Sequence, residues 1–399
     1  MFSSEFNTPK SELDLRIVKL QDHLKQHNID AALILQRVDL YYFSGTFQLG
    51  SLYIPVDGDP ILMVNRNTAR AKAESFVETI VHLEGPKRIP EIIKGKGYRI
   101  PDTLGLELDV LPTNMYLNYQ KLFSGTDIRD ISLAIRLQRA VKSQYELGIM
   151  RRAAGLSDQV AEWVPNIVRE GITELELAGL VEAEARRLGH QGVIRMRLWG
   201  SEMFYGHLLS GPTGAVPSYL SSPTGGTGAS PAIAQGPSYK TIQRHEPVMV
   251  DYIFAYNGYL CDHTRIYSLG DLPDDLLEAH ASMIEVQRII KKVARPGVTS
   301  GEIYNQALAK TQELGYEDHF MGAGGERVRF VGHGIGLEVD EFPFLAAGQK
   351  LELQPGMTIA LEPKLIFPGK GVVGIENTHV VADDGLEQLS QFPDEIMVI

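Results

Sequence analysis

Cysteine is almost absent from this sequence, which rules out an internal disulfide. Cys261 is the single cysteine among 399 residues, so it has no partner within the chain. Basic residues are also fewer than acidic ones. The chain has 38 Lys and Arg but 50 Asp and Glu, which gives a formal net charge of −12. Phosphate binding requires a basic surface, so we expect no nucleic-acid partner. The lack of disulfides favours a cytoplasmic protein.

Long apolar runs and targeting signals are missing as well. No apolar run reaches the length that spans a bilayer. The start, Met1 to Glu5, lacks the basic and then apolar pattern of a signal peptide. The glycine-rich stretch Gly225–Gly228 has neither the lysine of a phosphate-binding loop nor the spacing of a dinucleotide site. We therefore predict no membrane partner, and a flexible loop across residues 210–238.

The amino-acid composition and the chain length indicate a folded protein of two domains. Apolar residues make up 44% and charged residues 22%, which is typical of a soluble globule. A chain of this length is longer than the chains that usually fold around a single hydrophobic core. The first part alternates between helical and strand patterns, which predicts a small α/β domain over residues 1–130. The expected elements are helices at 12–30 and 68–76 and strands at 31–35, 51–55 and 60–64.

The rest of the chain reads as a helical linker followed by a duplicated unit. Residues 131–165 have strong helical character, and we expect them to lead into a second domain at 166–399. Within that domain Thr173 and Thr299 each occupy an N-cap position, with a glutamate three residues later. Such self-similarity indicates an internal repeat. The fold class of the whole chain is therefore predicted to be α+β, with a central cleft in the second domain.

A hairpin signal brings two aspartates together. Asn257-Gly258 is the strongest short signal for a β-hairpin. With these residues as the loop, Asp251 lies opposite Thr264, and Asp262 shares that face because side chains alternate. The two carboxylates become diagonal neighbours, about 7–8 Å apart at the backbone, and can reach one metal centre. Solvated surface aspartates are the alternative, but two acids on one face of an apolar strand would repel without a cation.

A second hairpin is predicted from Met357 to Val381. If its turn centres on Gly369, Glu362 lies opposite Glu376. The alternative is a pair of strand-end glutamates in solvent. Two hairpins that each present a pair of acids agree with the internal repeat.

A histidine between glycines completes the candidate ligands. His333 lies between Gly332 and Gly334, which allow close approach of backbone or ligand. A lone histidine is more often structural, but the neighbouring acid pairs favour a metal ligand here.

Four carboxylates and one imidazole form an oxygen-rich ligand set. Hard or borderline ions such as Mn²⁺, Co²⁺ or Fe²⁺ suit it, whereas a structural zinc site favours Cys and His. Four negative charges predict two divalent ions, which share one water and lower its pKa to give hydroxide near neutral pH. We expect Mn²⁺ or Co²⁺ first, with Zn²⁺ or Fe²⁺ as alternatives. The predicted ligands are Asp251, Asp262, His333, Glu362 and Glu376.

These motifs resemble the pita-bread (M24) metallopeptidase family, which includes aminopeptidase P, prolidase, methionine aminopeptidase and creatinase. The resemblance extends over nearly the whole chain. It rests on the Asp251/Asp262 and Glu362/Glu376 spacings and on the segments 262–265 and 332–337. Segments 30–34 and 42–45 resemble the small creatinase-like domain that precedes the catalytic domain in aminopeptidase P and prolidase. The resemblance implies a pita-bread catalytic domain and a homodimer.

The resemblance also implies a mechanism. Asp262 and Glu376 would bridge both ions, Asp251 would bind one ion, and His333 and Glu362 would bind the other. Glu362 would accept a proton from the bridging water, and the resulting hydroxide would attack the scissile carbonyl. The implied activity is hydrolysis of Xaa-Pro bonds in small peptides, by a dipeptidase or an aminopeptidase.

Departures from the family pattern concern the residues around the substrate. Arg329 and Asp340 replace histidines that peptidase members usually carry before and after the histidine ligand, and a third histidine upstream is missing. Arg329 and Asp340 are candidates for a charged pair near the metals, and His207 for the missing histidine. A structural salt bridge and a surface histidine are the alternatives. Gly374 replaces an arginine that prolidases often carry.

Three functional hypotheses follow from these observations. The first is an Xaa-Pro peptidase, which the ligand set and the domain plan favour. The second is a metal-dependent hydrolase of a small non-peptide amide or amidine, because the substrate-contacting histidines are replaced. The third is a non-catalytic family member that keeps a metal for stability.

Overall fold

The computed structural model describes residues 4–200, 202 and 205–399. The chain divides into two compact units, Met1–Arg139 and Ala140–Ile399. This division falls inside the segment 131–165 that we predicted as a helical linker, and the other predicted domain limits stay predictions. Within the described residues, the structure contains no helix that combines the length and the hydrophobicity required to span a bilayer.

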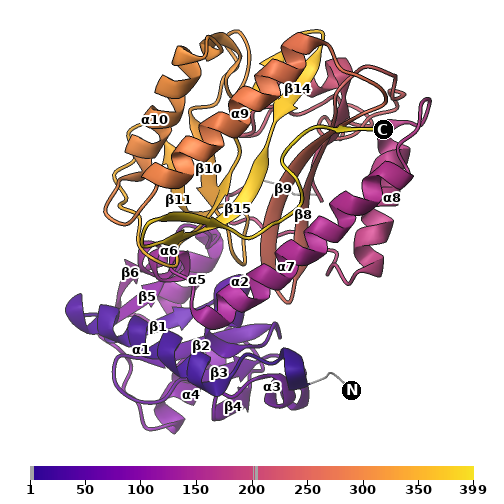
Figure 1. Ribbon diagram of the computed structural model, residues 1–399. Coiled ribbons are helices and arrows are strands. Elements are labelled where there is room, and N and C mark those ends of the chain that lie inside the picture. Colours follow the sequence, from indigo (N-terminus) through magenta and orange to yellow (C-terminus); the bar gives the residue numbers. More distant parts are fainter. Residues whose placement is uncertain (1–3, 201, 203–204) are drawn as a thin grey trace. The chain divides into compact units, whose positions relative to one another are not determined.

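The first unit is a mixed sheet with helices packed against it (Figure 1). Its strands are β1 (Ala31–Ile34), β2 (Gly50–Pro55), β3 (Ile61–Val64), β4 (Thr79–His82), β5 (Thr103–Leu106) and β6 (Asp127–Asp130). Its helices are α1 (Lys10–Gln26), α2 (Arg37–Ser44), α3 (Thr68–Glu74), α4 (Ile89–Gly95), α5 (Thr113–Leu122) and α6 (Ser132–Ala140). The strand order is β4-β3-β2-β1-β5-β6, and all four residues of β1 and of β3 are buried. The predicted α/β character of this part is confirmed.

The second unit is built on a nine-stranded sheet and a separate two-stranded ribbon. Its helices are α7 (Gln144–Trp163), α8 (Glu174–Arg187), α9 (Asp274–Val293) and α10 (Ser300–Glu313). The strands of the large sheet are β7 (Leu208–Ser210), β8 (Val248–Tyr256), β9 (Tyr259–Ser268), β10 (Phe330–Gly334), β11 (Glu341–Ala346), β12 (Thr358–Leu361), β15 (Glu376–Ala382), β16 (Gly385–Gln388) and β17 (Met397–Val398). The ribbon consists of β13 (Lys364–Phe367) and β14 (Gly371–Gly374).

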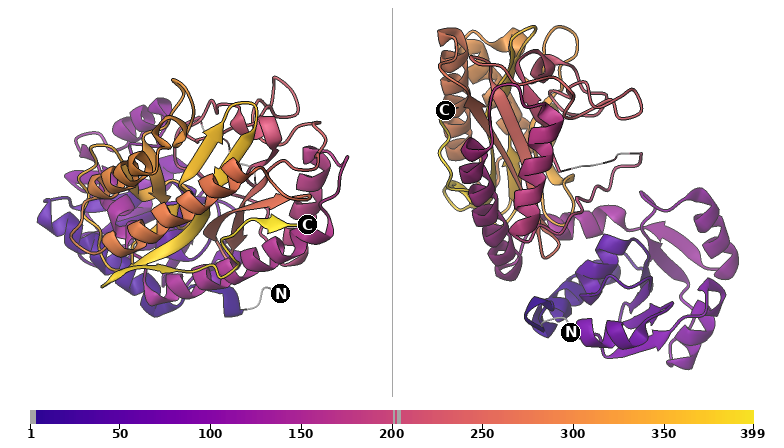
Figure 2. Two further views of the ribbon diagram at one scale, coloured as in Figure 1. Left: turned by 45° about the horizontal axis from the view of Figure 1, so that its top comes forward. Right: turned by 90° about the vertical axis from the view of Figure 1, so that its right-hand side faces the viewer.

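The two halves of the second unit repeat one order of elements. A 20-residue helix, a 14-residue helix and an antiparallel hairpin occur in each half, as α7, α8 and β8–β9, and as α9, α10 and β12–β15. Thr173 and Thr299 both cap their helices through the side chain, and Thr299 forms a full capping box with Glu302. Helices α9 and α10 lie side by side, and each half covers its own strands with its own helices (Figures 1 and 2).

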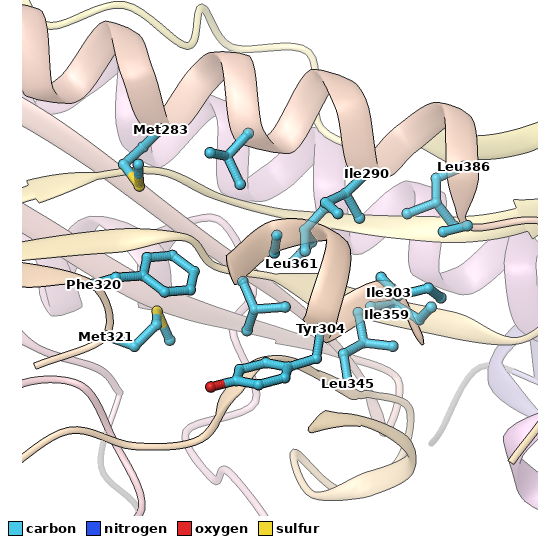
Figure 3. Packing of buried hydrophobic residues seen from close by; sticks show 14 of the residues in the cluster. Met283, Ile290, Ile303, Tyr304, Phe320, Met321, Leu345, Ile359, Leu361 and Leu386 are labelled. Carbon is cyan, nitrogen blue, oxygen red and sulfur yellow. The ribbon is translucent and has the colours of Figure 1, made fainter. Parts of the chain in front are cut away.

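The side chains of β12 and of the residue that follows it point alternately to the hydrophobic core and to the opposite face of the sheet. Ile359 and Leu361 pack with Met283 and Ile290 of α9 and with Ile303 of α10 in one buried apolar cluster (Figure 3). The residue that follows, Glu362, belongs to the opposite face and lines a cavity. Packing of the apolar cluster therefore holds β12 in place, and the orientation of β12 directs the side chain of Glu362 toward the cavity.

Strands β8 and β9 show the same alternation. Tyr267 donates from its hydroxyl to the carbonyl of Ala161 in α7 at 2.9 Å, and Ser157 lies 3.3 Å from a ring nitrogen of His263. The odd-numbered residues of β9 thus face α7. Asp262 and its even-numbered neighbours face the other side of the sheet.

Candidate active site

The first hairpin has the register that the sequence predicts. Tyr256 pairs with Tyr259, and Asp251 lies opposite Thr264. Strand β15 then pairs with the other edge of β9 and places Glu376 opposite the same threonine. The hydroxyl of Thr264 donates to Oε2 of Glu376 at 2.9 Å. Asp251, Asp262 and Glu376 thus all lie close to Thr264, because the two hairpins belong to one sheet.

The second hairpin also keeps the predicted register, although it is divided between two sheets. Leu361 pairs with Asn377 in the large sheet, and Lys364 pairs with Gly374 in the ribbon. Both pairings belong to one continuous register, in which Glu362 and Glu376 face each other at the division. Strand β10 lies beside β12, with His333 opposite Ala360.

The histidine and three carboxylates surround a space that fits one metal ion. The Nε2 atom of His333 is 3.9 Å from an oxygen of Asp262, 3.8 Å from one of Glu362 and 3.9 Å from one of Glu376. Two metal–ligand bonds of about 2.1 Å each add up to more than any of these separations. One ion can therefore bind both atoms of every pair. Atoms of Asp262, His333 and Glu376 all lie within 4.8 Å of one another.

A lysine that we did not predict lies among the same acids. The Nζ atom of Lys364 is 3.1 Å from Oδ2 of Asp251, 3.0 Å from Oε2 of Glu362 and 2.8 Å from Oε2 of Glu376. Its side chain is only 2% exposed. The signal was present in the sequence, because Lys364 follows Glu362 by two residues and so shares its face in an extended strand.

Burial, the mutual repulsion of the acids and the lysine charge together shift the pKa values of the carboxyl groups in different directions. Burial raises the pKa of Asp262 well above its usual range, and the nearby Glu376 and Asp251 charges raise it further. Burial also raises the pKa of Glu376, to about 8, although the Lys364 charge opposes this. For Asp251 burial also raises the pKa, but the charges and hydrogen bonds of Lys364 and His207 together outweigh burial and lower the pKa. Such separation of carboxyl pKa values is typical of a functional centre that needs a cation.

All eight predicted site residues line one cavity of about 690 Å³. They are the five candidate ligands together with His207, Arg329 and Asp340. The walls are largely apolar and include Met196, Leu198, Tyr219, Leu220, Phe330 and Phe344. An apolar cavity with a few convergent polar groups is the usual form of a small-molecule site.

The three predicted substrate-contacting residues differ in their surroundings. Arg329 is exposed, whereas Asp340 is buried and accepts the backbone N–H groups of Arg197 and Leu198 at 2.8 and 2.7 Å. His207 is buried, with Nδ1 3.7 Å from Oδ2 of Asp251. Arg329 alone of the three thus presents an exposed charge to the cavity.

The glycine-rich segment forms part of the cavity wall. Residues 219–222 and Gln235 line the cavity, and the side-chain amide of Gln235 is 2.8 Å from Nε2 of His207. The segment is held by its own hydrogen bonds, such as Gly236 N–H to the carbonyl of Gly225 at 2.7 Å and the hydroxyl of Thr224 to the carbonyl of Gly214 at 2.7 Å. It therefore shapes the site, a role that its composition did not reveal.

Comparison with known proteins agrees with this geometry. Residues 148–383 match metallopeptidase family M24, and residues 16–141 match the creatinase/prolidase N-terminal domain. The Xaa-Pro dipeptidase of Pyrococcus furiosus is 28% identical over 386 residues, which cover 96% of this chain and 99% of that protein. A probable dipeptidase, PepE, of Mycobacterium tuberculosis is 30% identical over 266 residues, 66% of this chain and 62% of that protein.

Solved structures give the same result for the fold. The Xaa-Pro dipeptidase from Bacillus anthracis has a TM-score of 0.83 at 25% identity, with coverage of 97% of this chain and 100% of that chain. The prolidase from Pyrococcus horikoshii has a TM-score of 0.79 at 25% identity, with coverage of 95% and 99%. The likeness therefore includes both units.

Proposed function

Because the chain belongs to metallopeptidase family M24 and is a hydrolase, we propose that it hydrolyses Xaa-Pro bonds in small peptides, and most readily in dipeptides. The observation that carries this proposal is the convergence of all five candidate ligands on one apolar cavity. Relatives named Xaa-Pro dipeptidase that match this chain over nearly their whole length support the choice of substrate. The hydrolase assignment speaks against the non-catalytic hypothesis.

The residues present fit a divalent metal at the His333 side of the acid cluster. A bound ion would lower the pKa of a coordinated water and polarise the scissile carbonyl. Glu362 is the proposed proton acceptor for the attacking water and the donor to the leaving amine, because its Oε1 atom faces the histidine side. The apolar walls would exclude bulk water and hold the proline ring.

A cation at the cavity supports the preference for dipeptides. The proline carboxylate of a dipeptide is ionised at neutral pH, and the exposed guanidinium of Arg329 offers it a charge-assisted hydrogen bond. In a longer peptide the same position is an amide without charge. We therefore propose dipeptidase activity ahead of aminopeptidase activity.

The test is hydrolysis by chelator-stripped protein that has been reloaded with Mn²⁺ or Co²⁺. Xaa-Pro dipeptides and longer Xaa-Pro-Yaa peptides are compared, with Glu362→Gln as the control and circular dichroism as the check of folding. Metal-dependent cleavage that the control lacks would support the proposal. Absence of cleavage of every Xaa-Pro peptide by the metal-loaded protein would refute it.

A small non-peptide amide or amidine is the second candidate substrate. The exchanged residues Arg329 and Asp340 both line the cavity, so its chemistry differs from that expected of a peptidase with three histidines there. The same metal-loaded protein is assayed against cyclic amides and amidines. Peptide turnover equal to or above turnover of these compounds would count against this candidate.

Several finer predictions accompany the proposal. The native ion is predicted to be manganese or cobalt, which metal analysis of the protein as purified would test. The protein is predicted to be a homodimer in solution, which light scattering would test. Its location is predicted to be cytoplasmic, which fractionation of the source cells would test. The hydroxide bridge between two ions, which four carboxylates led us to expect, also stays a prediction.

A further inference from the structure

We propose that the ammonium group of Lys364 occupies one of the two cation positions of this centre, so that the chain binds one divalent ion and not two. The inference rests on the metal-dependent activity proposed above, and it changes the number of ions from the two expected from four carboxylates. The ligands of the single ion would be Asp262, His333, Glu362 and Glu376.

The carboxylates define two neighbouring cation positions. Glu362 has Oε2 at 3.0 Å from the lysine nitrogen and Oε1 at 3.8 Å from the histidine nitrogen. Glu376 has Oε2 at 2.8 Å from the lysine nitrogen and Oε1 at 3.9 Å from the histidine nitrogen. Each glutamate therefore directs one oxygen to each position, as a bridging ligand does. Lys364 fills one position, and the other lies beside His333.

The lysine and a second metal ion would compete for the same oxygens. An ammonium group has three N–H donors, and three carboxylate oxygens lie within 3.1 Å of this nitrogen. An ion bound there would need those oxygens at about 2.1 Å, so it would occupy the place of the nitrogen. Lys364 would have to leave a buried position, where its side chain is 2% exposed.

A glycine on the neighbouring strand allows the two strands of the ribbon to approach closely at the lysine. Gly374 lies opposite Lys364 in the ribbon. A Cβ atom at position 374 would lie 2.6 Å from Cα and 3.1 Å from Cγ of Lys364, and 2.5 Å from the carbonyl oxygen of Pro363. A side chain at 374 would thus collide with the backbone of residues 363–364 and with the stem of the lysine. Gly374 therefore preserves the close approach of the two strands from which Lys364 reaches the acids.

The test is the number of metal ions bound by three forms of the full-length protein. Wild type, Lys364→Met and Lys370→Met are stripped, loaded with Mn²⁺ and freed of excess ion by gel filtration, and manganese per chain is measured by mass spectrometry. Lys370 is the matched control, because it belongs to the turn of the same ribbon and is exposed, with its partner Asp275 also exposed. We expect one ion in wild type and in the control, and two ions in Lys364→Met.

A second measurement covers the case in which Lys364→Met does not fold, which circular dichroism would reveal. Crystals of wild type loaded with Mn²⁺ should show one anomalous peak within bonding distance of Nε2 of His333, and none beside Oδ2 of Asp251. A peak beside Asp251 would overturn the inference.

The other outcomes separate this inference from the proposed function. Two ions in wild type would overturn the inference, and so would one ion in both wild type and Lys364→Met. Wild type without any bound ion would overturn it as well. The proposed function fails only if the loaded wild type also leaves every Xaa-Pro peptide uncleaved, a result that does not depend on the ion count.

Discussion

The side chain of Glu362 lies between two nitrogen atoms, with one oxygen toward the lysine and the other toward the histidine. A group in this position can accept a proton from water on the histidine side while the lysine keeps it oriented. Glu362→Gln should lower kcat at least 100-fold, the usual minimum for loss of a general base, with little change of fold because the two side chains have the same shape. Steady-state kinetics with a saturating Xaa-Pro dipeptide measures the effect. A kcat within threefold of wild type would remove Glu362 from the proton-transfer role.

Arg329 is the residue on which the length of the substrate should depend. A charge-assisted hydrogen bond is worth about 1.5–3 kcal/mol, so Arg329→Ala should raise KM for Xaa-Pro dipeptides about 10-fold or more. KM for an Xaa-Pro-Yaa amide, which has no carboxylate at that position, should change little. The ratio of the two KM values is the measurement. Equal increases for both substrates would mean that Arg329 does not recognise the proline carboxylate.

At the scale of elements, one buried arginine joins the two hairpins to the C-terminal segment. Arg265 of β9 donates to the backbone carbonyls of Glu376 in β15 at 3.0 Å and of Phe392 at 2.7 Å. It also donates to the carbonyl of Pro393 at 2.6 Å and to Asp394 at 3.0 Å. The pairing of β9 with β15 brings Glu376 to the site, so this arginine supports the geometry of the candidate metal ligands from the helix-covered face.

Arg265→Met should therefore destabilise the second unit by about 3–5 kcal/mol, the usual cost of removing one member of a buried charged network. Chemical unfolding followed by circular dichroism gives this free energy. Arg288→Met is the matched control, since Arg288 pairs with Glu285 on the surface of α9, and loss of such a pair costs less than about 1 kcal/mol. Equal effects of the two substitutions would show that Arg265 does not join the elements.

At the scale of the whole molecule, a buried neutral histidine predicts loss of stability in acid. Burial lowers the pKa of His379 to about 3, and the Lys291 charge adds to this. The unfolded chain binds a proton near pH 6.5, whereas the folded chain does not, so the free energy of unfolding falls as pH drops from 6.5 toward 3. At pH 5 this histidine alone should lower the free energy of unfolding by about 2 kcal/mol.

The measurement compares unfolding free energies at pH 7 and pH 5 in wild type and in His379→Leu. Other buried histidines, such as His190 with a pKa of about 4, remain in both proteins, so only the difference between the two decreases reports on His379. The decrease should be about 2 kcal/mol smaller in the variant. Identical decreases would show that His379 is not the group responsible.

Features that depend on neighbouring residues could be predicted from the amino-acid sequence. The turn at Asn257-Gly258 and the alternation of side chains fixed the register that sets Asp251 opposite Thr264. The glycine-containing turn at 368–370 did the same for Glu362 and Glu376. Turn geometry and the period of a strand are local properties, so a single sequence contains them. The α/β character of the first unit followed from local periodicity in the same way.

The way in which these hairpins and strands come together became evident from the three-dimensional fold. The pairing of β15 with β9 brings Glu376 to Thr264, and that of β10 with β12 brings His333 to the acids. Pairing between strands far apart in the sequence depends on packing of the whole sheet against its helices, which no turn specifies. For the same reason the sequence, which places Lys364 on the same face as Glu362, did not reveal that this lysine also reaches Asp251, or that the segment around Gln235 forms part of the cavity wall.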